Sequence, residues 1–206
     1  MQDKDGGETS VSVPGACLSP SHLRFLSEKR LRRRGRFLWA EARRVAEELL
    51  FVPYFYFRFV NPKYRNRFYL YGVLVDGIMG FSEFIRGSFE LKQLPVSGDL
   101  LLGKTILKEE AEAKARKAVE SFVLRRQSLW VKEIKVKLVE AGEVYYPYWV
   151  CYLETLKGIE ILALNGITGS PAGSRVEDIL RAGIARAESQ KPDRSGKSPT
   201  VTGFAG

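Results

Sequence analysis

The chain has 206 residues, of which 45% are hydrophobic and 12% aromatic, which is enough to bury a core and excludes a globally disordered protein. Its net charge is +9, and the segment between residues 24 and 44 supplies +7 of it, from nine Lys and Arg against two Glu. The longest apolar run, residues 49–57, is nine residues long, whereas a membrane-spanning helix needs ~20.

The N-terminal residues also argue against export. Asp3, Asp5 and Glu8 lie where a secretory leader would be basic, and no apolar stretch follows them. We therefore expect a cytoplasmic protein. The two cysteines, Cys17 and Cys151, provide no disulfide framework, and no metal ligand cluster or cofactor motif accompanies them.

The first half of the chain predicts a tail, a helix and three strands. Residues 1–20 are rich in Gly, Ser, Pro and acids and predict a disordered tail. Residues 21–50 predict a helix with a break at Gly35. The aromatic residues 51–59 and then 68–75 predict strands, and Asp76-Gly77 predicts a hairpin turn into a third strand.

The second half predicts the same succession. Residues 104–126 are rich in Ala, Glu, Lys and Arg and predict a helix. Residues 130–140, 144–155 and 159–164 predict strands, with Asn165-Gly166 as a turn after them. A helix at 174–188 follows, and the Ser, Gly and Pro-rich residues 190–206 predict a second disordered tail.

Two sets of short segments recur along the chain. Residues 53–59 resemble residues 147–153, which lie 94 positions later, and residues 75–80 resemble residues 164–169, which lie 89 positions later. A period near 90 is too long for a solenoid and predicts two homologous halves. The predicted fold class is α+β, with two tandem pseudo-symmetric repeats, each a helix packed on an antiparallel β-meander. We expect a first repeat at 21–97, which includes the basic N-terminal helix, and a second repeat at 98–172. We expect a C-terminal helix at 173–189 after them.

These repeats resemble PepSY-like and cystatin-like α+β domains. The resemblance lies in the helix at 108–124, the strand pair, and residues 164–169, which are similar to the terminal "DxxTG" turn of PepSY repeats. It covers residues 37–94 and 104–172, and Gly166 departs from the small non-glycine residue usual in that turn. The resemblance implies a binding or inhibitory module and not an enzyme.

A cluster of cations is the main candidate for a binding site. Dense positive charge on a helix is typical of phosphate contacts in RNA or DNA, but the same helix could dock on an acidic protein, lie on an anionic membrane surface, or be an ordinary solvated face. The cluster consists of Arg30, Arg32, Arg33, Arg34, Arg36, Arg43 and Arg44.

A smaller patch interleaves cations with an aromatic ring at Lys63, Tyr64, Arg65 and Arg67. Such a pattern occurs in single-strand binders, and it also fits a charged hairpin loop. An exposed edge strand would further allow a homodimer.

Residues 98–105 match the phosphate-loop expression G-x-x-x-x-G-K-[ST] through Gly98, Gly103, Lys104 and Thr105. The bulky leucines inside the loop and the predicted hairpins argue against a nucleotide-binding core, which needs parallel strands and crossover helices. The only histidine, His22, borders the predicted tail, so no positioned catalytic base is evident. We therefore expect a non-enzymatic binding or adaptor protein that presents a sheet and a basic helix to an anionic macromolecular partner. The alternatives are a nucleotide-binding protein and an RNA- or DNA-binding protein.

Overall fold

The computed structural model describes residues 8–34, 43–63, 67–85, 90–126, 136–156 and 158–189, without the side chains of residues 30–34, 62, 63, 67–69 and 126. Over these residues the fold is α+β, with three α-helices and mostly antiparallel strands. Its centre is a five-stranded sheet in the order β4-β3-β2-β6-β7. These strands are β2 (Arg43–Lys63), β3 (Arg67–Asp76), β4 (Ser82–Ile85), β6 (Lys137–Thr155) and β7 (Gly158–Asn165).

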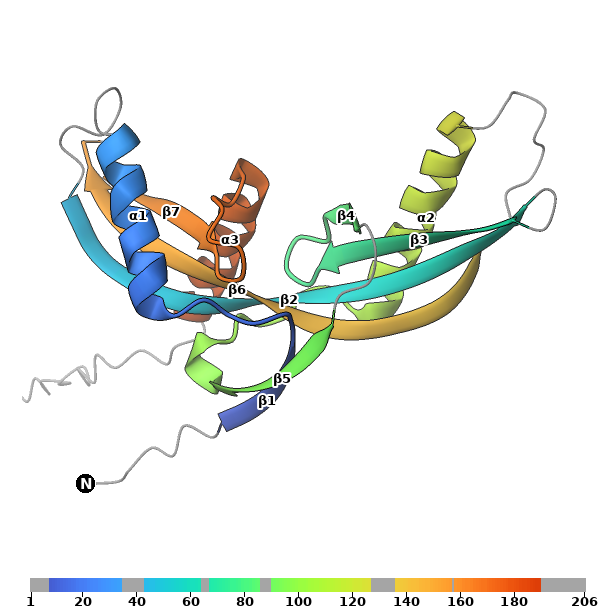
Figure 1. Ribbon diagram of the computed structural model, residues 1–206, viewed down its shortest axis with the longest axis horizontal. Coiled ribbons are helices and arrows are strands. Elements are labelled where there is room, and N and C mark those ends of the chain that lie inside the picture. Colours follow the sequence, from blue (N-terminus) through green and yellow to red (C-terminus); the bar gives the residue numbers. More distant parts are fainter. Residues whose placement is uncertain are drawn as a thin grey trace, which may run out of the picture.

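Strands β2 and β6 form the spine of the molecule and curve along its whole length (Figure 1). Their antiparallel register runs from Arg43 opposite Glu154 to Val60 opposite Lys137. The pairing is interrupted twice, because Val45 and Val139 are each an extra residue without a partner in the opposite strand. Such β-bulges bend and twist a strand, which fits the curvature of the spine.

The two faces of the sheet are covered differently. Helix α2 (Lys108–Arg126) packs on β2 and β3 through a core that includes Phe57. Helix α1 (Pro20–Arg34) packs on the same face over β6 and β7 through a core that includes Cys151. Helix α3 (Ser174–Ser189) covers part of the opposite face, where alternate residues of β2 such as Val52 point.

A small second sheet packs against the middle of the spine. Strands β1 (Glu8–Pro14) and β5 (Leu91–Ser97) pair antiparallel and bury Val11, Val13 and Val96 against Phe51. The predicted disordered tail over residues 1–20 is therefore wrong for residues 8–14. Val11 and Val13 are buried because β1 pairs with β5 and packs on Phe51, and the local composition reveals neither contact.

The predicted helix over residues 21–50 is wrong in its second part. Helix α1 ends at Arg34, and residues 43–50 form the first third of β2. Locally these residues are good helix formers, but pairing with residues 148–154 of β6 overrides that preference. In consequence, the core beneath α1 is formed mainly by β6 and β7, with Leu49 of β2 packed against it.

Three of the predicted features fall where the structure gives no description. The predicted helix break at Gly35, the first part of the predicted strand at 130–140 and the predicted C-terminal tail at 190–206 lie outside the described residues.

The two β-turns that were predicted from Asp76-Gly77 and Asn165-Gly166 have matching geometry. Gly77 N donates to Pro53 O at 2.7 Å, and Gly166 N donates to Pro147 O at 2.7 Å. Gly80 and Gly169 both adopt positive φ, 75° and 67°, which favours glycine. Each turn is also hydrogen-bonded to the loop that precedes a helix. Gly77 O accepts from Thr105 N before α2, and Gly166 O accepts from Leu18 N before α1, both at 2.7 Å.

Candidate anion-binding groove

Helix α2 presents two adjacent stripes of side chains. Ala111, Ala115, Val119 and Val123 are at most 1% exposed and pack on the sheet. A helix repeats every 3.6 residues, so the next stripe over, at positions 114, 117, 121 and 125, lies at the border of that contact. This second stripe carries Lys, Lys, Ser and Arg, and it forms one wall of a groove.

The opposite wall is the turn after β3 together with β4. Asp76 is fully buried and accepts backbone hydrogen bonds from Ile78 N at 3.1 Å, Met79 N at 2.6 Å and Phe81 N at 2.6 Å. These bonds fix the course of residues 77–81, and they set the start of β4 against the helix. Gly80, Ser82 and Phe84 then face α2.

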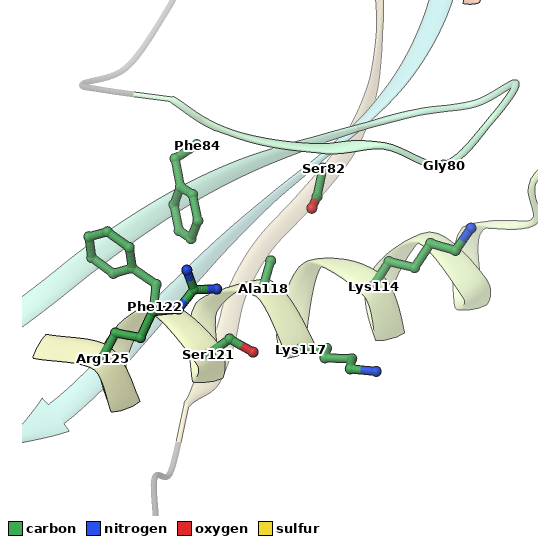
Figure 2. Close-up of a pocket in the computed structure, with 9 residues that line it drawn as sticks. All are labelled: Gly80, Ser82, Phe84, Lys114, Lys117, Ala118, Ser121, Phe122 and Arg125. Atoms are coloured by element: carbon green, nitrogen blue, oxygen red, sulfur yellow. The ribbon is translucent and has the colours of Figure 1, made fainter. Parts of the chain in front are cut away.

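The groove between these walls has a volume of about 540 Å³ and is open to solvent. The rings of Phe84 and Phe122 lie 4.8 Å apart at one end, and Lys114 lies beside Gly80 at the other (Figure 2). Nine described residues line it: Gly80, Ser82, Phe84, Lys114, Lys117, Ala118, Ser121, Phe122 and Arg125.

The described lining of the groove is cationic, since three of these residues are Lys or Arg and none is acidic. Lys114 Nζ pairs with Glu110 Oε1 at 3.0 Å on the same helix. Lys117 and Arg125 have no ion pair with any described residue and are exposed. Two unneutralised cations beside aromatic rings are suited to an anion that also carries flat apolar groups.

Gly80 is required for the position of Lys114. Its φ of 75° already favours glycine. In addition, a Cβ at this position would collide with Lys114 Nζ and lie 3.2 Å from its Cδ and Cε. The absence of a side chain at residue 80 therefore lets the lysine reach across the turn.

The predicted basic cluster is split between two elements. Arg30, Arg32, Arg33 and Arg34 belong to α1, but their side chains are not described, and Arg36 lies outside the described residues. Arg43 and Arg44 lie on β2 and not on a helix, which corrects the prediction of one basic helix. The reason is again the pairing of this segment with β6.

Acidic neighbours neutralise part of that cluster. Arg44 pairs with Glu47 at 3.2 Å and with Glu28 at 3.6 Å, and Arg24 also pairs with Glu47. Arg43 is exposed and has no ion pair with a described residue. These contacts tie α1 to β2 and leave less free positive charge there than the composition indicated.

The secondary patch lies at the far end of the first hairpin. Lys63 and Arg67 are opposite each other where β2 passes into β3. Tyr64 and Arg65 lie outside the described residues. This end of the sheet is the one that α2 approaches with its C-terminus (Figure 1).

The segment from Gly98 to Thr105 does not open a helix, because α2 begins only at Lys108. Gly98 starts a short 3₁₀ turn, Leu102 N donates to Phe51 O at 3.0 Å, and Thr105 N donates to Gly77 O at 2.7 Å. The backbone amides of Leu102 and Thr105 are thus engaged within the protein and are not available to a phosphate.

The side chains of this segment are engaged as well. Lys104 Nζ donates to Glu143 Oε2 at 2.7 Å, a bond that raises the pKa of Lys104. Thr105 Oγ1 accepts from Arg186, and Gly103 has open space around its Cα. The segment closes the junction between α3 and the sheet, and nucleotide binding there stays an untested prediction.

The described residues show no group of three or more His, Cys, Asp and Glu that could hold a metal ion. Cys151 is buried under α1, and burial raises the pKa of its thiol. His22 lies in the first turn of α1.

Sequence reasoning missed the groove. It identified only the apolar side of the 104–126 helix, and it gave Phe84 no role in a site. The available signal was the repeat of Lys, Lys, Ser and Arg at helical spacing beside Phe122, but only the tertiary position of β4 turns this stripe into a groove.

Comparison with known proteins finds no protein-family model, no curated protein and no solved structure that matches the chain. Within the part of the chain that the structure describes, no helix has the length and apolar character needed to span a bilayer.

Proposed function

We propose that this chain is a non-enzymatic binding protein that holds an anionic macromolecule in the groove between α2 and β4. The observation that carries the proposal is the pair Lys117 and Arg125, which are exposed and have no acidic partner among the described residues, beside the rings of Phe84 and Phe122. A cationic side chain without a counter-charge gains most from an anionic ligand.

The basic residues of α1 form a second contact surface in this proposal. Arg32, Arg33 and Arg34 follow one another in the last turn of the helix, and Arg43 at the start of β2 has no ion pair with a described residue. Figure 1 places α1 and α2 toward opposite ends of the curved sheet. One extended anionic partner can therefore meet basic residues at both ends.

We also infer that the two helices occupy these places because the chain is an internal duplication. The positional shift of 94 residues relates Tyr54 to Tyr148, and these residues lie opposite Asp76 and Asn165 in their hairpins. The same shift of 94 relates the two bulge residues Val45 and Val139.

The matched hydrogen bonds of the two turns support the same inference, since each turn binds a Pro carbonyl and the loop before a helix. The resemblance to PepSY-like repeats belongs with this proposal. In the duplicated arrangement each half lends its helix to the other half, because α1 packs on β6 and β7 while α2 packs on β2 and β3.

The proposal is tested with heparin as a general polyanion. Fluorescently labelled heparin is titrated with the full-length chain at several salt concentrations, with the Lys117→Gln/Arg125→Gln variant alongside. We expect the variant to bind about tenfold more weakly, and the slope of log affinity against log salt to fall by about two, one for each lost cation.

The matched control changes Lys92 and Arg181 to Gln, since both are exposed, lie on β5 and α3, and are not among the residues that line the groove. This control removes the same charge and is expected to keep nearly full affinity. A third variant changes Arg32, Arg33 and Arg34 to Gln. If only that variant loses binding, the anionic contact is α1 and the groove proposal is wrong.

A further inference from the structure

We propose that the occupant of the groove is single-stranded nucleic acid, with phosphates on Lys117 and Arg125 and a base stacked on Phe84. The inference rests on the proposed function, because it assigns a ligand class to the same groove. It goes further in one respect: it requires a flat aromatic group in the ligand, which a general polyanion lacks.

The aromatic end of the groove supports base stacking. Phe84 is 39% exposed although it lies on a strand of the sheet, so one part of its ring is open to solvent. Its other side is fixed by Phe122, whose ring is 4.8 Å away and tilted by 39°, and Tyr71 holds Phe122 in an edge contact at 5.9 Å. A partly exposed ring that is held in place from behind is a stacking platform.

The cations that line the groove lie along one side of α2. Lys114, Lys117 and Arg125 share one side of α2, and the rise of a helix places Lys117 about 4.5 Å beyond Lys114 and Arg125 about 12 Å beyond Lys117. The hydroxyls of Ser82 and Ser121 lie between these charges and make no hydrogen bond to a described side chain or backbone group. A row of cations with intervening hydroxyls fits a sugar-phosphate backbone.

The lining disfavours an amphipathic helical peptide as the occupant. Such peptides gain affinity by laying their apolar face into a hydrophobic groove. None of the described lining residues is Leu, Ile, Val or Met, so the apolar surface that they provide consists of two aromatic rings and Ala118. A duplex is disfavoured as well, because its bases are stacked on each other and their faces are not available to Phe84.

The test compares two probes of equal charge. A labelled 12-nucleotide single strand is titrated against an abasic strand of the same length, in RNA and DNA forms, with wild type and Phe84→Leu. We expect Phe84→Leu to weaken binding of the base-containing strand about tenfold and to leave the abasic strand nearly unchanged. The matched control is Phe81→Leu, since Phe81 is 40% exposed but faces Arg175 of α3.

A Phe84→Trp variant guards against a loss of fold. It keeps a stacking surface, so we expect wild-type affinity and a change in tryptophan fluorescence when the base-containing strand binds. The proposal is supported whether the chain binds the RNA strand or the DNA strand more tightly.

The nucleic-acid proposal would be overturned if the base-containing strand and the abasic strand bound equally well and Phe84→Leu had no effect on either. If heparin binding still depends on Lys117 and Arg125 in that case, the proposed function stands without the nucleic-acid assignment. Polyglutamate that displaces heparin from the groove more strongly than the single strand does would point to an acidic protein instead. If none of the groove variants changed the affinity for any polyanion, both proposals would be wrong.

Discussion

At the scale of single residues, Asp76 determines the geometry of the groove wall. Its two carboxylate oxygens accept from three backbone N–H groups and the side chain is fully buried. Asn165 has the matching place in the second turn and accepts from two, Ile167 N at 2.9 Å and Thr168 N at 3.0 Å. Ser170 N, which follows, donates to Thr168 Oγ1 instead.

Asp76→Asn is therefore expected to destabilise the fold, whereas Asn165→Asp is expected to cost much less. The amide introduced at position 76 would place an NH₂ group against a backbone N–H that now has an acceptor, which costs about 1–3 kcal/mol in the free energy of unfolding. Urea unfolding of both variants measures the difference. Equal stability of wild type and Asp76→Asn would contradict this account of the turn.

A tyrosine cluster beneath α3 predicts a loss of stability in alkali. Burial raises the pKa of Tyr54 well above its ordinary value of 10.0, and burial likewise raises the pKa values of Tyr146 and Tyr148. The ring of Tyr54 meets that of Tyr146 edge-on at 5.1 Å. The folded protein thus favours the neutral phenols.

Unfolded tyrosines release their protons near pH 10, before these buried ones do. Above about pH 10 the unfolded state binds fewer protons than the folded state, so the free energy of unfolding falls as pH rises. Urea unfolding between about pH 9 and pH 12 should show this fall, and Tyr148→Phe should make it shallower. Ultraviolet titration in which all nine tyrosines ionise at ordinary pH before unfolding would refute it.

At the scale of elements, helix α3 shows where packing outweighs propensity. Gly183 lies within the helix and is buried against two core side chains. An added Cβ would lie 2.8 Å from Leu102 Cδ1 and 2.9 Å from Ile78 Cδ1, and both side chains are nearly fully buried. The helix can approach Leu102 and Ile78 this closely only because residue 183 has no side chain.

Gly183→Ala is expected to lower stability by about 1 kcal/mol, since the gain of about 1 kcal/mol in helix propensity is smaller than the overpacking cost of about 1–3 kcal/mol. Ile78→Val removes the Cδ1 atom that clashes, so the double variant should recover part of the loss. Thermal and urea unfolding of the three proteins measure the coupling, and a Gly183→Ala protein more stable than wild type would show that the core can yield freely.

At the scale of the whole molecule, the two halves of the chain depend on each other. Helix α1 comes from the first half and buries Leu23 against Leu153 and Leu162 of the second half. Helix α2 comes from the second half and buries Val119 against Phe57 of the first. Neither half alone retains the partner that covers its sheet.

If the chain is divided between residues 85 and 90, we therefore expect the two fragments to associate with each other. When both fragments are produced together, a tag on one should recover the other in equal amount. Each fragment produced alone should lack cooperative unfolding, because one face of its sheet is uncovered. Cooperative unfolding of a separate fragment would show that the helix exchange is not needed for folding.

Local chemistry was enough to predict some elements. Residues 108–126 form the predicted helix because Ala, Glu, Lys and Arg favour a helix and no Gly or Pro interrupts the segment. The stripe of Ile179 and Leu180 likewise predicted α3, and glycine at positions 77 and 166 marked the turns. The recurrence of short motifs also anticipated which segments have matching turns, because turn geometry depends on a few neighbouring residues.

Long-range contacts decided the rest. Residues 43–50 carry helix-favouring side chains but pair with β6, and residues 8–14 become a strand only beside β5. The basic residues that stood out in the composition are partly neutralised by Glu28 and Glu47, whereas Lys117 and Arg125, which have no ion pair with a described residue, line a groove only because β4 lies beside α2. Propensity and turn chemistry act over a few residues, whereas strand pairing, ion pairing and groove formation depend on segments far apart in the chain, so only the tertiary structure could settle them.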